Sequence, residues 1–438
     1  MTTDPKSPTA NSTTPRRTFL KSSAVVATGA LVTGALQVPH VHAAGSDELK
    51  VALIGCGGRG TGAAVNAMRA DKRNKLWALA DVFQDRLGGV KQTLKDEATK
   101  LGADQYAVTD ERCFHGFDAY KQIMATEADV VCLCTPPHFR PAQLRAAIEA
   151  GKHVFCEKPV AVDATGVRSV LETTELAKKK NLNIVSGLCW RYDYGVRETM
   201  DQIKQGAIGD IVAIHANYLT STLWNKPRQP AWSDMEFQLR NWLYFNWLSG
   251  DFNNEQHIHT LDKVLWLMGD EPPVACVGMG GRQVRTGEEF GNVYDHFGVV
   301  YEWANGVKAF AFCRQMGASH NNTECYALGT KGQAQILSHK IEGAAKWSYA
   351  KKNEKPSMYD VEHVELFKAI RDGKTINNGT YMSRSTLLAI MGRNSAYTGQ
   401  RITWEQAMNS KEDLTPKAYE FGPLEMAPVQ QPGSAKLV

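Results

Sequence analysis

The stretch "VALIGCGGRGTG", which begins at Val51, constrains the fold of this chain more than any other. Its apolar start predicts a buried strand, and the small residues that follow predict a helix. Between the two, Gly55, Gly57 and Gly60 fit the spacing G-x-G-x-x-G. Glycines at these positions permit a tight turn, close approach of a pyrophosphate and close packing of the helix on its sheet. The turn therefore predicts a dinucleotide site, with cofactor-binding residues Gly55, Gly57, Gly58, Arg59 and Gly60.

The next apolar run, "KLWALADVF", predicts a second strand that ends at Asp81, 21 residues past Gly60. A carboxylate there accepts hydrogen bonds from the ribose hydroxyls of NAD and repels the 2′-phosphate of NADP. Arg86 lies a little downstream and softens this preference. A turn aspartate without a ligand is the alternative interpretation. We expect NAD, rather than NADP, as the cofactor.

Three more apolar runs, at 128–137, 152–160 and 182–191, alternate with helical patterns. Strands that alternate with helices predict a parallel, doubly wound α/β sheet, and such sheets bind ligands at the carboxyl ends of their strands. "TPPHFR" and "CEKP" stand at two of those ends. The further predicted cofactor-binding residues are therefore Thr135, Pro136, His138, Glu157 and Lys158.

The second half of the chain has another pattern. Runs such as "GDIVAIHANYLT", "VACVGMGGRQV" and "TECYALGTKGQAQIL" predict successive strands, with turn signals such as Ala304-Asn305-Gly306 between them. A helical return is expected near 360–400. The residues after about 415 have no period, which predicts an extended tail.

The glycine turn, "CTPPHFR", "CEKPVAVD" and the later "HTLD" together resemble the Gfo/Idh/MocA oxidoreductases in order and spacing. The resemblance covers roughly residues 48–410, and Glu157-Lys158-Pro159 is its most specific part. It implies similarity to glucose–fructose oxidoreductase and inositol dehydrogenase. Such proteins have an N-terminal Rossmann domain and a C-terminal α/β domain. The largely antiparallel open sheet of the second domain faces the nicotinamide and often builds the interface of a dimer or tetramer. We expect a signal at 1–45, an NAD-binding domain at 48–190, a substrate and oligomerisation domain at 191–415 and a tail at 416–438.

The stretch "EQHIHTLD", residues 255–262, is the candidate for proton transfer. On a helix, Glu255 and His259 are i and i+4 and share a face. The family resemblance implies that His259 is the catalytic histidine and Asp262 the acid that follows it. Glu255 stands where the family has Asp, and His257 where it has Gly. A satisfied core histidine and a metal site are the alternatives, but E-x-H-x-H is not a standard zinc spacing and we predict no metal.

These residues lead to an expected reaction. Oxidation of a secondary alcohol needs a base for the hydroxyl proton and a positive charge where alkoxide character develops. We expect His259 to be the base and Lys158 to supply the charge, with Glu255 as the third catalytic residue. A sugar or cyclitol is the substrate that the family implies, and the candidate substrate residues are Trp190, Arg191, Tyr192, His257 and Asp262. A redox-neutral NAD-dependent glycosidase or lyase, with Tyr192 or Glu255 as a further base, is the first alternative. A non-enzymatic NAD- or sugar-binding module is the second.

The first 45 residues predict an export signal. Arg16 and Arg17 are followed by Phe19-Leu20, a weakly apolar run and small residues, as in a twin-arginine signal. An ordinary signal or a retained membrane anchor is the alternative. The twin-arginine route exports folded proteins, so we expect a periplasmic or other extracytoplasmic protein that carries its cofactor with it. Most of the net charge of +4 lies in this leader, and the rest of the chain has no basic stripe for nucleic acid. Nine cysteines without a CxxC pair predict no structural zinc.

Overall fold

The computed structural model describes residues 47–102, 104–350 and 356–438, and the following account concerns these residues. The predicted signal at 1–45 lies outside them. Within the described part of the chain, no helix combines the length and the apolar character that crossing a membrane requires.

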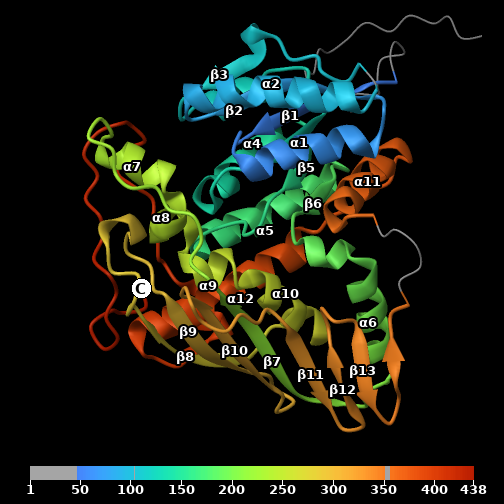
Figure 1. Cartoon of the computed structure of the whole chain (residues 1–438), viewed down its shortest axis with the longest axis vertical. Helices are drawn as coiled ribbons and strands as arrows, with labels where there is room; N and C mark the ends of the chain where they lie inside the picture. Colours follow the sequence, from blue (N-terminus) through green and yellow to red (C-terminus); the bar gives the residue numbers. More distant parts are fainter. Residues whose placement is uncertain (1–46, 103, 351–355) are drawn as a thin grey trace, which may run out of the picture. The chain divides into compact units, whose positions relative to one another are not determined.

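The first half of the described chain builds a parallel sheet of six strands in the order β3-β2-β1-β4-β5-β6 (Figure 1). Its central strands are buried on both faces, as expected for a sheet that helices cover on either side. The predicted doubly wound α/β sheet is confirmed. The strands are β1 Leu49–Ile54, β2 Asn74–Asp81, β3 Cys113–His115, β4 Val130–Leu133, β5 His153–Cys156 and β6 Ile184–Ser186.

Helices connect these strands. The first helix, α1, starts at Gly58 and lies so close to the sheet that a Cβ at Gly60 would stand 1.8 Å from the carbonyl oxygen of Gly55. Small buried residues such as Ala63 and Ala64 continue that contact. The remaining bounds are α1 Gly58–Ala70, α2 Gln84–Lys100, α3 Ala119–Met124, α4 Arg140–Glu149, α5 Ala164–Lys179, α6 Tyr194–Lys204, and the 3-10 turns η1 Asp110–Arg112, η2 Pro137–Phe139 and η3 Cys189–Tyr192.

The second half builds a nine-stranded sheet in the order β14-β13-β12-β11-β7-β10-β9-β8-β15. Its strand pairs are antiparallel except β7 with β10, so the predicted largely antiparallel sheet is confirmed. Buried and exposed residues alternate along β10, because only one face is covered. The strands are β7 Ile211–Thr220, β8 Ala275–Gly281, β9 His296–Glu302, β10 Lys308–Gln315, β11 Cys325–Gly329, β12 Gly332–Gln335, β13 Lys340–Gly343, β14 Trp347–Ser348 and β15 Ile402–Thr403.

Helices α10 and α12 pack on the covered face of this sheet. A second group, α7 to α9 with η4, follows β7 and leads into α10 (Figure 1). The bounds are α7 Asp234–Arg240, η4 Trp242–Tyr244, α8 Asn246–Ser249, α9 Asp251–Glu255, α10 Ile258–Leu267, η5 Glu288–Phe290, α11 Met358–Arg371, α12 Gly379–Thr398 and α13 Trp404–Asn409.

The helical return near 360–400 forms, but its two helices pack differently. Helix α11 lies against α1 of the first domain, whereas α12 lies against α5 and β8 (Figure 1). Ile184 of β6 also donates its N–H to the carbonyl oxygen of Ile376 at 2.9 Å. The segment around α11 therefore completes the dinucleotide-binding domain, although it follows the second sheet in sequence.

Candidate active site

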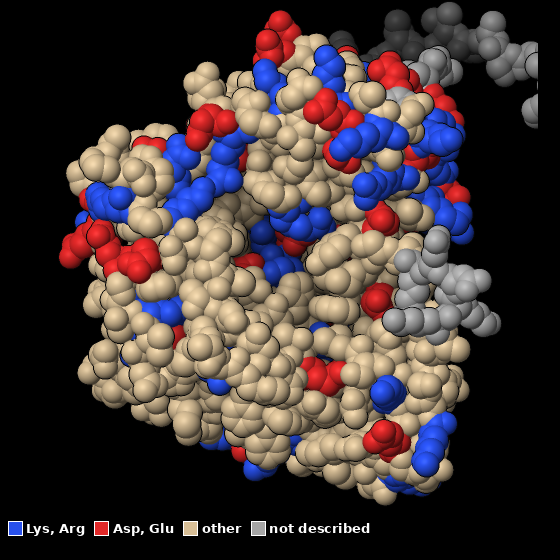
Figure 2. Space-filling view, viewed as in Figure 1, with Lys and Arg blue, Asp and Glu red and all other residues tan. Residues whose placement is uncertain are grey.

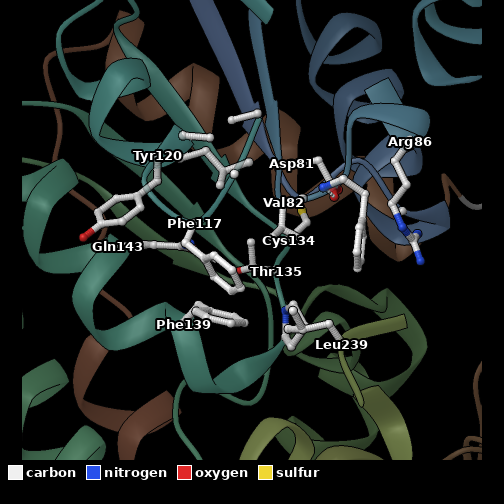
Figure 3. Close-up of a pocket in the computed structure, with 18 of the residues that line it drawn as sticks. Asp81, Val82, Arg86, Phe117, Tyr120, Cys134, Thr135, Phe139, Gln143 and Leu239 are labelled. Atoms are coloured by element: carbon white, nitrogen blue, oxygen red, sulfur yellow. Dashed lines mark hydrogen bonds between the residues drawn. The ribbon is translucent and has the colours of Figure 1, made fainter. Parts of the chain in front are cut away.

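A pocket opens at the carboxyl ends of β1, β2 and β4 (Figure 3). Gly55 stands at its floor with φ +95°, and a Cβ there would lie 2.7 Å from the backbone of Cys134, so the turn requires glycine. Helix α1 begins beside the pocket, and its N-cap residue, Gly57, has no side chain with which to cap the first turn. The first-turn N–H groups are thus available to a phosphate. Predicted cofactor residues that line this pocket are Gly55, Gly57, Asp81, Thr135 and Pro136.

Asp81 is nearly buried at the end of β2. Its carboxylate accepts hydrogen bonds from the backbone N–H groups of Cys56 at 2.7 Å and Phe83 at 2.9 Å. Burial raises the pKa of Asp81, and the two N–H donors oppose that rise. Each carboxylate oxygen keeps a free lone pair, so Asp81 can still accept from a ribose. Arg86 also lines the pocket, as the sequence suggested. The residues present fit a dinucleotide.

Arg59 belongs to the glycine turn, but its guanidinium points elsewhere. It forms ion pairs with Glu157 of the "CEKP" segment and with Glu362 of α11, the latter at 2.7 Å. Burial raises the pKa of Glu157, but Arg59 and Arg140 outweigh it and lower the net value; burial keeps the pKa of Glu362 high. This buried network ties the glycine turn to β5 and α11. The contact of the Arg59 and Glu157 side chains with the cofactor stays a prediction.

His138 does not line the pocket either. Its Nε2 lies 2.7 Å from the hydroxyl of Tyr419, and its ring packs edge-on against Trp247 of α8. Burial lowers the pKa of His138 to about 4. The predicted cofactor contact of His138 is therefore indirect, because other residues of the loop after β4 reach the pocket while His138 meets the tail.

The helix expected over "EQHIHTLD" is broken. Helix α9 ends at Glu255 and α10 begins at Ile258, so Glu255 and His259 do not continue one helix face. Glu255 instead holds Lys158: the Lys158 Nζ donates to the carbonyl oxygen of Glu255 at 2.6 Å and to its carboxylate at 2.9 Å. Both side chains are largely buried, with 11% and 7% of their surface exposed. A buried, doubly bonded ammonium is fixed in direction.

Two further residues extend this arrangement. Gln256 donates from its amide to the second carboxylate oxygen of Glu255. Tyr218 of β7 donates its hydroxyl to the Gln256 Oε1 at 2.9 Å, and its ring lies 6.4 Å from the ring of His259. Burial raises the pKa of Tyr218, so the hydroxyl stays protonated. The chain from Tyr218 through Gln256 and Glu255 to Lys158 positions the ammonium from the second sheet.

His259 is half-buried, and its Nδ1 finds no partner among the described residues. Burial holds the pKa of His259 well below its usual value, and the positive charges of Lys158, Lys263 and Arg59 lower it further. The imidazole is therefore neutral at pH 7 and able to accept a proton. Lys263, one turn later on α10, donates to the carbonyl oxygen of His259 at 2.6 Å. Figure 2 shows a hollow near the middle of this face of the molecule, with basic side chains inside it.

The structure buries His257 completely, with its Nδ1 3.0 Å from the Oδ1 of Asn253. This burial does not support the expected substrate contact of His257, which stays a prediction. The break between α9 and α10 turns His257 toward the core of the second domain. Together Glu255, His257 and His259 do not converge, and no cluster of metal-ligating side chains occurs in the described ranges.

The other predicted substrate residues also have structural partners. Arg191 forms a bidentate ion pair with Asp262, with N–O distances of 2.9 to 3.0 Å, and a second ion pair with Asp270. The hydroxyl of Tyr192 donates to Asn378 at 2.8 Å in a buried setting. Trp190 is half-buried, 5.0 Å from the Lys263 Nζ. Arg191, Asp262 and Tyr192 therefore hold η3, α10 and the start of α12 together, and their contact with a substrate stays a prediction.

Sequence reasoning missed several residues at both ends of the site. Tyr218 and Gln256 were not singled out, although a tyrosine near the end of a strand and a glutamine inside "EQHIH" are visible signals. Trp242 of the run "NWLYFNWLSG" lines the dinucleotide pocket, and Trp247 contacts His138. The tail residues Tyr419 and Phe421 were missed because an aperiodic segment gives no indication of what it covers.

Comparison with known families and proteins agrees with this geometry. The model of an oxidoreductase family with an NAD-binding Rossmann fold, GFO_IDH_MocA, matches residues 49–187. The model of the GFO/IDH/MocA C-terminal domain matches residues 196–335. The first domain is therefore an NAD-binding Rossmann domain, and the predicted cofactor class is confirmed.

Named relatives are similar over part of their length. A 2,7-anhydro-N-acetylneuraminate hydratase from Escherichia coli is 28% identical over 49% of this chain and 53% of its own. A myo-inositol 2-dehydrogenase from Thermotoga maritima is 27% identical over 51% of this chain and 56% of its own. The chain thus spans about half the length of these curated relatives. The solved aldose-aldose oxidoreductase from Caulobacter crescentus, 18% identical, has the same fold with a TM-score of 0.63 over 81% of this chain and 99% of its own.

Proposed function

Because the chain belongs to the Gfo/Idh/MocA oxidoreductase family, we propose that it is an NAD-dependent oxidoreductase acting on a secondary hydroxyl of a sugar or cyclitol. One observation carries the proposal: two hydrogen bonds fix the Lys158 ammonium on Glu255, beside the break that leads to His259. Burial and then the charge of Lys158 lower the pKa of His259, so the imidazole is neutral. A fixed cation beside a neutral base is the pair that alcohol oxidation needs. The myo-inositol 2-dehydrogenase among the relatives supports the substrate class.

In this mechanism His259 takes the proton of the substrate hydroxyl on a ring nitrogen. Lys158 faces the same oxygen and stabilises the negative charge that develops on it. Glu255 holds the ammonium from two directions, so the charge is oriented before the substrate arrives. The glycine turn and Asp81 would hold the dinucleotide, which would supply the hydride acceptor when bound.

The test is a set of single variants assayed by the appearance of NADH with a panel of sugars and cyclitols. We expect His259→Ala to lower kcat/KM by about two to four orders of magnitude and Lys158→Ala to cost a similar factor. His320→Ala, on an exposed loop, is the matched control and should leave the rate unchanged. EDTA should have no effect. If His259→Ala keeps most of the activity, or EDTA abolishes it, the assignment fails.

The alternative is a redox-neutral cycle, in which a sugar hydroxyl is oxidised, a glycosidic bond is eliminated, water adds and the hydroxyl is restored. The similarity to the 2,7-anhydro-N-acetylneuraminate hydratase supports this alternative. The same Lys158 and His259 serve both reactions. Tyr192, the earlier candidate for a further base, is buried against Asn378, which leaves Glu255 for that role. Release of aglycone from an aryl glycoside without net NADH would favour this alternative over the dehydrogenase.

We also retain export by the twin-arginine route as a proposal, on the strength of Arg16 and Arg17 in the leader. A protein exported by this route works outside the cytoplasmic NAD pool, which favours a cofactor that stays bound between turnovers. Fusion of residues 1–45 to a reporter that is active only when it is exported folded tests the signal. Replacement of Arg16 and Arg17 by lysine should abolish that export.

A further inference from the structure

The tail, residues 411–438, contains neither helix nor strand, yet it follows a fixed path (Figure 1). It starts on the second domain, where the backbone N–H of Lys411 donates to the carbonyl oxygen of Val438 at 2.8 Å. Between these neighbours it runs to the first domain and back. The N–H of Leu414 donates to Asp163, the N-cap of α5, at 3.1 Å, and Glu412 pairs with the buried Arg393. An aperiodic segment held at so many points is an ordered part of the fold.

The middle of the tail covers the dinucleotide domain. Tyr419 packs against Phe117 and Phe139 with ring centroids 5.8 Å apart in each case, and its hydroxyl meets His138. Phe421 packs against Phe83 at 5.9 Å and Phe117 at 5.3 Å. We call these tail residues and their partners the aromatic cluster; its members are Phe83, Phe117, His138, Phe139, Tyr419 and Phe421.

The cluster has a specific relation to the pocket. Phe83 follows β2, Phe117 follows β3 and Phe139 belongs to η2 after β4. All three line the same pocket as Asp81, and Figure 3 labels two of them, Phe117 and Phe139, inside it. Tyr419 and Phe421 therefore touch the outer sides of the residues whose inner sides form the pocket wall. Movement of the tail away from the domain would release three wall residues at once.

The tail is also fastened to a second covering element. The N–H of Met235 in α7 donates to the carbonyl oxygen of Gly422 at 3.1 Å, and Gln238 donates to that of Leu424 at 2.9 Å. The same helical region supplies Leu239 and Trp242 to the pocket. Tail and α7 thus form one outer wall over the end of the site where Asp81 marks the ribose.

We propose that tail residues 413–424 are a strap that retains the dinucleotide, so that NAD leaves only when the aromatic cluster opens. The inference rests on NAD binding by the first domain and not on the proposed reaction. Its basis is the contact of Tyr419 and Phe421 with three pocket-wall residues, together with the anchoring of the tail on both sides of that contact. A retained cofactor exchanges at the opening rate of the strap rather than at that of its own contacts.

The experiment measures NAD dissociation. Protein purified without added cofactor is denatured in acid to quantify bound NAD, and intact protein is then mixed with excess fluorescent ethenoadenine NAD to time the exchange. We expect the double variant Tyr419→Ala/Phe421→Ala to exchange at least about 10-fold faster than the original protein, since it loses five ring contacts with the aromatic cluster. Tyr419→Phe, which loses only the hydroxyl bonded to His138, should fall between the two.

The control is Met426→Ala, an exposed tail residue outside the aromatic cluster, which should exchange like the original protein. Unfolding curves for each variant establish that the fold is intact. Unchanged exchange in the double variant, or an equal increase in Met426→Ala, would overturn the strap. Failure of the original protein to bind NAD at all would overturn both the strap and the cofactor assignment. If the variants exchange NAD at the expected relative rates but the protein has no dehydrogenase activity, the strap stands and the proposed reaction is refuted.

Discussion

The neutral state of His259 is set by its surroundings, and this has a consequence for pH. Burial first, and then the charges of Lys158, Lys263 and Arg59, hold the pKa of His259 well below 6.5. A base of that kind stays unprotonated as pH falls through the usual histidine range. We expect kcat/KM to hold its plateau to below pH 6.5 and to decline only at lower pH, which a pH–rate profile of the purified enzyme will measure.

Lys263 offers a way to check the cause. It is buried and lies one turn from His259, whose carbonyl oxygen accepts from its Nζ, whereas the Lys158 Nζ donates to Glu255. In Lys263→Met one positive neighbour is lost, so the pKa of His259 should rise and the acid limb should move to higher pH. An acid limb that stays in place, with the fold intact, would show that Lys263 contributes no charge there.

Asp81 sets the choice between NAD and NADP. Asp81→Ala removes an acceptor for the ribose and a charge that repels a 2′-phosphate, so we expect the Kd for NAD to rise more than the Kd for NADP. Titration of cofactor fluorescence gives both constants. Asp85→Ala, exposed at the start of α2, is the control. Equal weakening of both cofactors would mean that Asp81 acts only by bracing the backbone of Cys56 and Phe83.

For His257, the structure predicts an effect on stability, whereas its position in the sequence suggests an effect on substrate affinity. Because it is wholly buried against Asn253, His257→Ala should lower the free energy of unfolding by about 1–3 kcal/mol, through a cavity and a lost hydrogen bond. KM should change little. Denaturant unfolding and steady-state kinetics on one preparation separate the two effects. A raised KM at unchanged stability would show that His257 contacts the substrate instead.

At the scale of elements, prediction succeeded where the signal was local. The strand, glycine turn and helix around Gly55 form one contiguous unit, and the position of Asp81 follows from strand length. The break between α9 and α10 was not predicted, because no glycine or proline marks it in residues 251–262. Arg191 and Asp262 look like ligands in sequence, and their mutual pairing depends on where η3 meets α10 in space.

The aromatic cluster illustrates the same limit. Phe83, Phe117 and Tyr419 come from three segments that share no periodic pattern, and only the folded chain brings their rings together. A turn after a strand is readable from Gly, Pro and Asn, whereas the partner of an exposed aromatic residue in a loop is not. Packing partners that are distant in sequence are therefore what the structure adds to the sequence.

At the scale of the whole molecule, one face of the second sheet is uncovered by the residues that the structure describes. Exposed apolar side chains gather on its strands β7, β8 and β10, where Met279 is 75% and Phe312 41% exposed. Such a face marks an interaction surface, and we propose that a second copy of the chain covers it. Light scattering after size exclusion should give a dimer or tetramer, and Met279→Glu/Phe312→Asp should reduce the mass. Val364→Glu, on α11, is the control; a monomeric original protein would refute the proposal.

Finally, the position of α11 has a consequence for how this protein is made. Its Glu362 meets Arg59 across 303 positions of sequence, and its Leu366 and Phe367 belong to the same core cluster as β1. A ribosome adds about 5–20 residues per second, so a nascent first domain that ends near residue 190 waits roughly 10–35 s for Glu362 and the helix that closes it. A fragment that ends near residue 190 lacks that helix. Any graft of the dinucleotide-binding domain onto another protein must therefore carry residues 356–378 as a second piece.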